Sequence, residues 1–236
     1  MSLTDKQAIR DLDHISLQII SRQLSAESLT WLKAKAEMVK SEGKSFQLNM
    51  AFAHLPRFSS KADINIEPEE NKAVAQLLHG FKITDWTLDR LCRVWLLMQV
   101  PADDQDVYFK KINGLFTASE MNEQVALYSA LPLFHYPEIW VSRCEEGIRS
   151  NIGTVLEAIM YHNPYPAAFL AEGAWNQLVL KAFFTEKDVN LIVGLYERLN
   201  KALANTLEDY VQERLAAHRT ILPEIYKLIE QTKEKI

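Results

Sequence analysis

The sequence predicts an all-α protein built from a stack of antiparallel helices, and three observations carry this prediction. Apolar residues recur at spacings of three and four, first in two stripes that run from Ile9 to Ile19 and from Leu29 to Val39. Glycine, with 7 residues, and proline, with 8, are too scarce for the many turns of a β-sandwich or barrel. Short linkers join the expected helices with no strand pattern between them, so we expect an α-solenoid-like stack or an irregular helical bundle.

The spacing of apolar residues also places the individual helices. The two opening stripes predict a helical hairpin, and a third helix is expected over about 45–54. Residues 56–70 lack helical periodicity and are expected to form a loop. Thr84 is the expected cap of a central helix whose inward stripe runs from Leu88 to Met98. Further helices are expected over residues 71–79, 105–117, 120–131, 138–161, 174–184, 188–217 and 223–232.

The net charge changes sign across the loop that follows the third helix. Residues 1–62 carry 9 basic and 6 acidic side chains, a net charge of +3, whereas residues 63–135 carry 6 and 11, a net charge of −5. The helical pattern resumes directly after the loop. We therefore expect residues 1–236 to form a single domain, with only a weak possible boundary in the loop 56–68.

Composition and charge disfavour several classes of function. The formal net charge is −5 and no block of lysine or arginine stands out, so no nucleic-acid partner is expected. The first residues, MSLTDKQAIRDLDH, are polar, and no run approaches the roughly eighteen apolar residues that cross a bilayer. We expect a cytoplasmic protein that does not insert directly into a membrane.

The sequence contains none of the usual enzymatic motifs, such as a glycine-rich phosphate loop or a serine elbow. The DDQD stretch at 103–106 does not match the DDxxD pattern of prenyl-diphosphate enzymes, because Val107 stands where the last aspartate belongs. These aspartates fit the start of a helix better. Cys92 and Cys144 lie inside helical apolar patterns and are expected to be core residues. No metal site and no cofactor are predicted.

One expected helix, 138–161, places polar residues in a line beside its apolar stripe. Glu146, Arg149 and Glu157 fall on one side of that helix, with Gly153 between the last two. A glycine there leaves room for a ligand or another helix to approach, which makes a polar groove floor one interpretation. The other, which the spacing alone favours, is a solvated helix face with an exposed ion pair.

The segment from His162 to Pro166 is expected to be a rigid turn. Its two prolines stop the preceding helix and are expected to hold the backbone of Tyr165 extended. Such a turn suits a binding site that presents the tyrosine, and it suits a structural elbow equally well. Trp175, in the next apolar stripe, is expected to belong to the core.

Several of these segments together resemble the EboA family. The resemblance runs through PRF with Lys61 and Ala62, then the Trp86, Asp89 and Arg93 spacing followed by LL. It continues through ALPLFHYPE, EEGIRSN, NPYP, AWNQLVLKAFF and ERLAAHR, and so covers about residues 52–219. Members of this family are small helical proteins encoded beside a prenyltransferase-like membrane protein in bacterial metabolite-traffic operons.

The resemblance implies that the chain handles a small aromatic or isoprenoid-related metabolite together with the enzymes and the membrane protein of its operon. Positions in the family motifs then become candidate ligand-binding residues, to which the helix face described above adds Glu157. The candidates from the motifs are Arg57, Trp86, Asp89, Arg93, Glu146, Arg149, Asn151, Asn163, Tyr165, Trp175, Asn176 and Lys181. Charged groups at such positions indicate either a binding cleft or a buried polar network.

Two classes of function fit these residues, and an enzyme is a third. In the first, a non-catalytic carrier holds an apolar or aromatic metabolite while Arg57, Arg93 and Arg149 neutralise an anionic end. In the second, a scaffold docks the other proteins of the operon and binds no small molecule. An enzyme would use Lys181 or Glu157 as its acid or base. We favour the carrier.

Overall fold

The computed structural model describes residues 5–41 and 46–235, and it confirms the all-α fold. The described residues form thirteen α-helices, four short 3-10 helices and no strand. The α-helices are α1 (Lys6–Gln23), α2 (Ala26–Ser41), α3 (Phe46–His54), α4 (Pro68–Leu77), α5 (Leu88–Met98), α6 (Gln105–Ala118), α7 (Met121–Ser129), α8 (Val141–Ile148), α9 (Gly153–Met160), α10 (Tyr165–Phe169), α11 (Glu172–Phe184), α12 (Lys201–Ala216) and α13 (Pro223–Lys235). The 3-10 helices are η1 (Leu55–Arg57), η2 (Leu131–Leu133), η3 (Pro137–Trp140) and η4 (Val189–Leu191). Ser45, where the third helix was expected to begin, lies outside the described residues.

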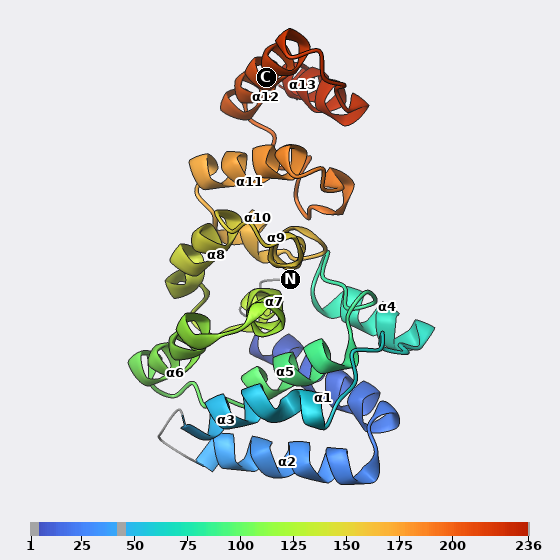
Figure 1. Cartoon of the computed structure of the whole chain (residues 1–236), viewed down its shortest axis with the longest axis vertical. Helices are drawn as coiled ribbons and strands as arrows, with labels where there is room; N and C mark the ends of the chain where they lie inside the picture. The colour runs from blue at the N-terminus through green and yellow to red at the C-terminus, as the bar shows by residue number, and fades with distance from the viewer. Residues whose placement is uncertain (1–4, 42–45, 236) are drawn as a thin grey trace.

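The helices stack along the longest axis of the molecule, broadly in chain order (Figure 1). Helices α1, α2 and α3 lie at one end with α5 beside them, α7 follows nearer the middle, and the α12–α13 hairpin lies at the other end. Helix α5 contacts α1 and α7, α7 contacts α9, and α11 contacts both α8 and α12. A single cluster of buried apolar side chains runs from Leu12 in α1 to Ile229 in α13. This is the solenoid-like stack that the sequence predicted.

Helix α5 is buried along almost its whole length, as expected for a central helix. Its N-terminal cap is Thr87, whose hydroxyl oxygen accepts a hydrogen bond from the backbone N–H of Arg90 at 3.3 Å. The expected cap at Thr84 is therefore wrong. Thr84 lies in the preceding turn, which the backbone N–H of Trp86 closes on the Ile83 carbonyl at 3.0 Å.

The loop expected over 56–70 is shorter at both ends. It begins after η1, which ends at Arg57, and it ends before Pro68, because Glu67 and Glu70 form a capping box that starts α4 before the expected position. Between these helices the chain runs along the start of α5, where the backbone N–H of Leu88 donates to the Ala62 carbonyl at 2.9 Å. Helices on the two sides of the loop contact each other, as α1 contacts α4 and α5. The single domain stays a prediction.

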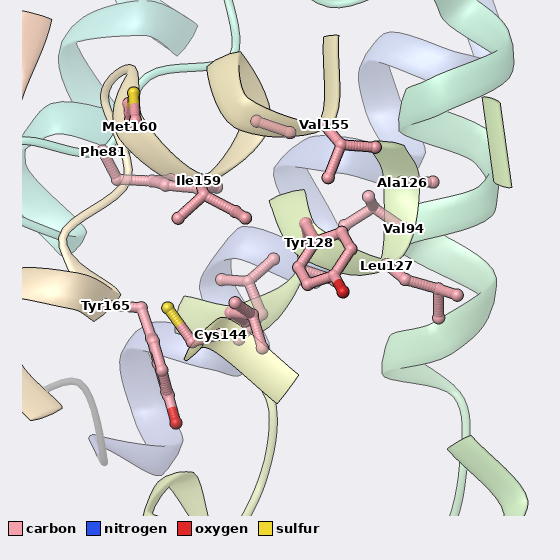
Figure 2. Packing of buried hydrophobic residues seen from close by; sticks show 14 of the residues in the cluster. Phe81, Val94, Ala126, Leu127, Tyr128, Cys144, Val155, Ile159, Met160 and Tyr165 are labelled. Carbon is pink, nitrogen blue, oxygen red and sulfur yellow. The ribbon is translucent and has the colours of Figure 1, made fainter. Parts of the chain in front are cut away.

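The long helix expected over 138–161 is wrong, because the chain breaks it into η3, α8 and α9. Helix α8 ends at Ile148, and Ile152 adopts an extended conformation before Gly153 opens α9. Helix α9 then packs back against α8 and α7. A Cβ atom on Gly147 would collide with the side chains of Ile159 and Tyr128, so this close packing depends on the glycine. Figure 2 shows Tyr128, Val155 and Ile159 in this part of the core.

The expected helix over 188–217 is also wrong, because only its second part, α12, is helical beyond the short η4. The chain turns at Gly194, which has a positive φ of 77°. A Cβ atom there would lie 2.6 Å from the Cβ atom of Ala167, so the turn packs directly on α10. Asn200 then caps α12 by accepting a hydrogen bond from the backbone N–H of Leu203 at 2.9 Å.

The segment from His162 to Pro166 turns as expected, but Tyr165 is not extended. Pro164 has helical backbone angles, and Tyr165 is the first residue of α10. The turn itself is made at His162, which has a positive φ of 51°. Tyr165 is fully buried in the core near Cys144 (Figure 2). Its ring is therefore not presented at the surface.

Candidate functional site

A pocket of about 510 Å³ lies between the first turns of α1, the end of α5 and the loop that contains η2 and η3. We call it the amino-terminal pocket. Its volume falls in the range of roughly 300–1,000 Å³ that is typical of small-molecule sites. The lining residues are Lys6, Ile9, Arg10, Asp13, Met98, Ala102, Asp103, Leu133, Phe134, His135, Tyr136, Pro137 and Glu138.

The amino-terminal pocket combines apolar and charged side chains. Ile9 and Met98 are half-buried, and Phe134 is buried. Lys6 and Arg10 are exposed on the first two turns of α1. An apolar lining with a few charged groups is the usual composition of a site for a drug-sized amphipathic molecule.

Three hydrogen bonds hold the pocket loop in place, two from side chains of the loop itself and one from α10. The indole N–H of Trp140 donates to the His135 carbonyl at 2.9 Å, and the Tyr136 hydroxyl donates to the Ala102 carbonyl at 2.6 Å. From behind, the buried Tyr165 hydroxyl donates to the Pro137 carbonyl at 2.5 Å. The pocket wall is thus preorganised, which limits the entropy that a ligand must remove on binding.

His135 is the titratable group of this loop with a perturbed pKa. Partial burial lowers the pKa of His135, and the nearby positive charge of Lys6 lowers this pKa further. The imidazole is therefore neutral at pH 7, with one nitrogen as a donor and the other as an acceptor. The positive charges that line the pocket at this pH come from Lys6 and Arg10.

None of the thirteen residues proposed from the sequence lines the amino-terminal pocket. Two of them, Asp89 and Arg93, form a buried ion pair one turn apart on α5. Arg93 also donates through Nε to the Phe52 carbonyl at 3.3 Å, and Asp89 accepts a hydrogen bond from the Ser59 hydroxyl at 3.2 Å. This pair belongs to the buried polar network that was one of the two interpretations, and it ties α5 to α3 and the loop after η1.

The other two candidates near the start of α5 differ in exposure. Trp86 is buried and packs edge to face on Phe81, with 5.7 Å between the ring centres. Arg57 is exposed at the end of η1. Arg57 and Arg93 therefore lie in different environments, and their shared role in the carrier hypothesis stays a prediction.

Asn163, Trp175 and Asn176 are buried as well. The side-chain amide of Asn163 donates to the carbonyls of Tyr128 and Ala158 at 3.1 and 2.9 Å. Asn176 exchanges two hydrogen bonds with Asn200, the cap of α12, at 3.1 and 2.9 Å. These contacts join neighbouring helices of the stack. Trp175 lies fully in the core, as the sequence predicted, with the Arg198 guanidinium 4.8 Å from its ring centre.

The candidates for acid–base chemistry do not meet. Lys181 donates to Asn151 at 3.4 Å, and Glu157 pairs with Lys187 at 2.5 Å. Neither Lys181 nor Glu157 lines the amino-terminal pocket. Because Glu146 lies on α8 and Glu157 on α9, the line of polar residues along one helix is broken.

Glu146 and Arg149 are the two proposed residues that line a common pocket. This second pocket has a volume of about 280 Å³ and lies between α6, α7 and the end of α8. We call it the arginine pocket. It is lined by Phe116, Gln124, Tyr128, Arg143, Glu146, Arg149 and Ser150.

The sequence interpretation missed the residues of the amino-terminal pocket. Lys6 and Phe134 are far apart in the chain, and the periodicity of α1 does not indicate which of its faces is covered. A signal was present in the ALPLFHYPE stretch, because the amino-terminal pocket takes residues 133–138 from it. A helix-breaking proline on each side of a histidine and a tyrosine is a pattern typical of a fixed surface loop.

The fold and the pockets define an all-α stack of short helices whose concave sites include the amino-terminal pocket and the arginine pocket. The model of the family described as metabolite traffic protein EboA matches residues 13–230, and the chain belongs to this family. No curated protein and no solved structure matches the chain. Within the described residues, no helix has both the length and the apolar character needed to cross a bilayer. The same residues contain no group of three or more His, Cys, Asp or Glu side chains placed to hold a metal ion.

Proposed function

We propose that this EboA-family protein is a non-catalytic carrier that binds a small aromatic or isoprenoid-related metabolite in the amino-terminal pocket. It would hand this metabolite between the enzymes and the prenyltransferase-like membrane protein of its operon. One observation carries the proposal: a preorganised, partly apolar pocket of about 510 Å³ takes much of its lining from a family motif.

The lining of the pocket suits a ligand with an apolar body and a polar end, because Lys6 and Arg10 line it together with the carboxylates of Asp13, Asp103 and Glu138. Ile9, Met98 and Phe134 offer apolar contact, and burial of an apolar ligand against them is stabilising at about 25 cal/mol per Å². Lys6 and Arg10 suit a carboxylate or phosphate at the mouth. Asp13 accepts a hydrogen bond from Gln99 at 2.6 Å, so part of its charge is already satisfied within the protein.

Two residues proposed from the sequence as ligand contacts, Tyr165 and Asn163, lie behind the pocket wall. Tyr165 holds the carbonyl of Pro137, and Asn163 accepts a hydrogen bond from the backbone N–H of Tyr165 at 3.0 Å. We therefore assign these two residues to positioning the pocket wall. They share the NPYP motif, which gives that motif a structural role in binding.

Filling the amino-terminal pocket tests the carrier proposal. Ala102 lines the pocket, and an Ala102→Trp substitution adds an indole there while leaving the charged residues in place. Native mass spectrometry of wild-type protein incubated with host small-molecule extract is expected to show an adduct of a few hundred daltons. Ala102→Trp is expected to lose this adduct, and the matched Ala102→Ser control is expected to keep it.

Two results would contradict the carrier proposal. An adduct that persists in Ala102→Trp would place the ligand elsewhere. A wild-type protein without any adduct, under conditions in which a reference carrier keeps its ligand, would leave the scaffold as the function to pursue. The melting temperature of each variant shows whether a lost adduct reflects a filled pocket or a damaged fold.

A second candidate function, a scaffold for the other proteins of the operon, is favoured by apolar residues at the carboxy-terminal end of the stack. Phe184, Leu215, Leu222 and Tyr226 are each more than two-fifths exposed. Phe184 packs on Tyr210 with 4.9 Å between the ring centres. Tyr210 and Leu222 together line a groove of about 280 Å³. Exposed apolar side chains at the end of a helical stack are typical of a protein-binding surface.

The scaffold function is tested with purified operon proteins and size-exclusion chromatography. A complex that persists without metabolite, and that Leu222→Glu abolishes, is expected if this end is a docking surface. Ala102→Trp should leave that complex intact. A chain that elutes alone with every operon protein would exclude the scaffold while leaving the carrier proposal untouched.

A further inference from the structure

The arginine pocket contains one arginine that its surroundings hold firmly in place. Arg143 donates through Nε to Asn113 at 2.8 Å and pairs through Nη1 with Glu146 at 2.6 Å. Its guanidinium carbon lies 5.4 Å from the ring centre of Phe116. The remaining amino group, Nη2, has no hydrogen-bond partner among the described residues. Because these contacts already fix the planar guanidinium group of Arg143, Nη2 can bind a further acceptor with little loss of side-chain freedom.

Two further donors line the same pocket without a partner in the described part of the chain. The first is the hydroxyl of Tyr128, a residue labelled in Figure 2. Its buried ring packs edge to face on Phe116, with 5.2 Å between the ring centres. Burial raises the pKa of Tyr128 to about 12, so the hydroxyl remains a donor at neutral pH. The second is the guanidinium of the exposed Arg149, the C-terminal cap residue that follows α8.

The charges around the arginine pocket do not cancel. Arg143 and Arg149 contribute two positive charges, and Glu146 is the one carboxylate among the lining residues. Ser150 adds a hydroxyl that accepts a hydrogen bond from the backbone N–H of Ile152 at 3.1 Å and keeps its own proton to donate. The lining thus has a net charge of +1 and several donors that converge on a space of about 280 Å³.

We propose that the arginine pocket is a separate binding site for an oxyanion, the phosphate or carboxylate group of a small molecule. The oxyanion accepts hydrogen bonds from Arg143 Nη2, the Tyr128 hydroxyl and Arg149, with Ser150 as a further donor. A guanidinium fork matches the geometry of both groups. The Glu146 carboxylate competes with the oxyanion for Arg143 and so lowers the affinity of the arginine pocket for the oxyanion. The proposal does not depend on the amino-terminal pocket holding a metabolite.

Inorganic phosphate and acetate are the probes that test the oxyanion site, because neither has an apolar body to bind elsewhere. Each is titrated at constant ionic strength, and the backbone amide signals of Arg149 and Ser150 are followed by NMR. Both signals are expected to shift and saturate. A response to phosphate alone assigns the site to phosphate compounds, a response to acetate alone assigns it to carboxylates, and a response to both supports the shared chemistry.

Three substitutions sharpen the test. Arg149→Gln is expected to weaken binding about tenfold or more, since it removes a charge-assisted hydrogen bond. Tyr128→Phe keeps the packed ring and is expected to weaken binding less. Glu146→Gln is expected to tighten binding several-fold, because the competing carboxylate is gone. A structural role for these residues predicts no such gain.

The matched controls are Arg57→Gln, which removes an exposed arginine outside the pocket, and Ala102→Trp in the amino-terminal pocket. Both are expected to bind phosphate or acetate as the wild type does. The oxyanion site is refuted if the Arg149 and Ser150 signals respond to neither anion. It is also refuted if Arg57→Gln weakens binding as much as Arg149→Gln, because the anions would then respond to net charge alone.

Discussion

Two acid–arginine pairs, each about one turn apart on a helix, occupy very different environments in this protein. The Asp89 and Arg93 side chains on α5 are 6% and 2% exposed, whereas those of Glu146 and Arg143 on α8 are 57% and 19% exposed. The first pair also makes hydrogen bonds with the Phe52 carbonyl and the Ser59 hydroxyl. The second borders a pocket and leaves one guanidinium nitrogen open. Residue type and spacing are nearly the same, so burial decides whether such a pair holds the fold or faces a ligand.

The largest effect is expected where the buried pair is broken. Arg93→Met keeps most of the side-chain volume but leaves the Asp89 carboxylate buried without its partner. We expect the free energy of unfolding to fall by about 3–5 kcal/mol, measured by urea denaturation at pH 7.

The double variant Asp89→Asn with Arg93→Met separates charge from packing. Because the double variant has no buried carboxylate without a partner, it is expected to recover a large part of the stability that Arg93→Met loses. If the double variant is as unstable as Arg93→Met, the pair would contribute through packing alone. The comparison between the two pairs would then lose its electrostatic basis.

An intermediate effect is expected at Gly147, which sets how closely α8 packs on its neighbours. A Cβ atom at this position would collide with Ile159 of α9 and with the ring of Tyr128 on α7. We expect Gly147→Ala to lower the free energy of unfolding by about 1–3 kcal/mol through overpacking, although alanine favours the helix. Differential scanning calorimetry measures this loss as a lower melting temperature.

Because Tyr128 also lines the arginine pocket, Gly147→Ala should disturb phosphate or acetate binding as well. Gly173→Ala is the matched control, since no atom lies within 4 Å of a Cβ atom placed at this helical glycine. If Gly147→Ala and Gly173→Ala both raised the stability, the packing of α7, α8 and α9 around Gly147 would not be close enough to require a glycine. That packing would then not explain why α8 ends at Ile148.

The helix breaks show what the sequence could and could not predict. The presence of helices and the buried course of α5 followed from apolar spacing alone. The break after Ile148 did not, because Ile148, Ile152, Val155 and Ile159 continue the helical period across it. The break follows from the packing of α9 on α7 and α8 across Gly147. Such a contact between separate helices cannot be predicted from the residue spacing within one segment.

The candidate sites show the same limit. Sequence motifs led to Glu146 and Arg149, which share the arginine pocket, and also to Asp89 and Arg93, which are buried. Motif membership therefore did not distinguish a pocket wall from a structural pair. The amino-terminal pocket escaped prediction because α1, the end of α5 and residues 133–138 meet only through the stacking of the helices.

The smallest effect is expected at the exposed pair. Glu146→Gln keeps the size of the side chain and removes the partner of Arg143, which Asn113 and the Phe116 ring still hold. Because exposed ion pairs contribute about 0–1 kcal/mol, the free energy of unfolding should change by less than about 0.5 kcal/mol. Urea denaturation of Glu146→Gln and Arg93→Met side by side measures the contrast directly. If Glu146→Gln lowered the free energy of unfolding nearly as much as Arg93→Met, the exposed pair would be structural. Tighter binding of phosphate or acetate by Glu146→Gln without such a loss would assign the pair to a binding site.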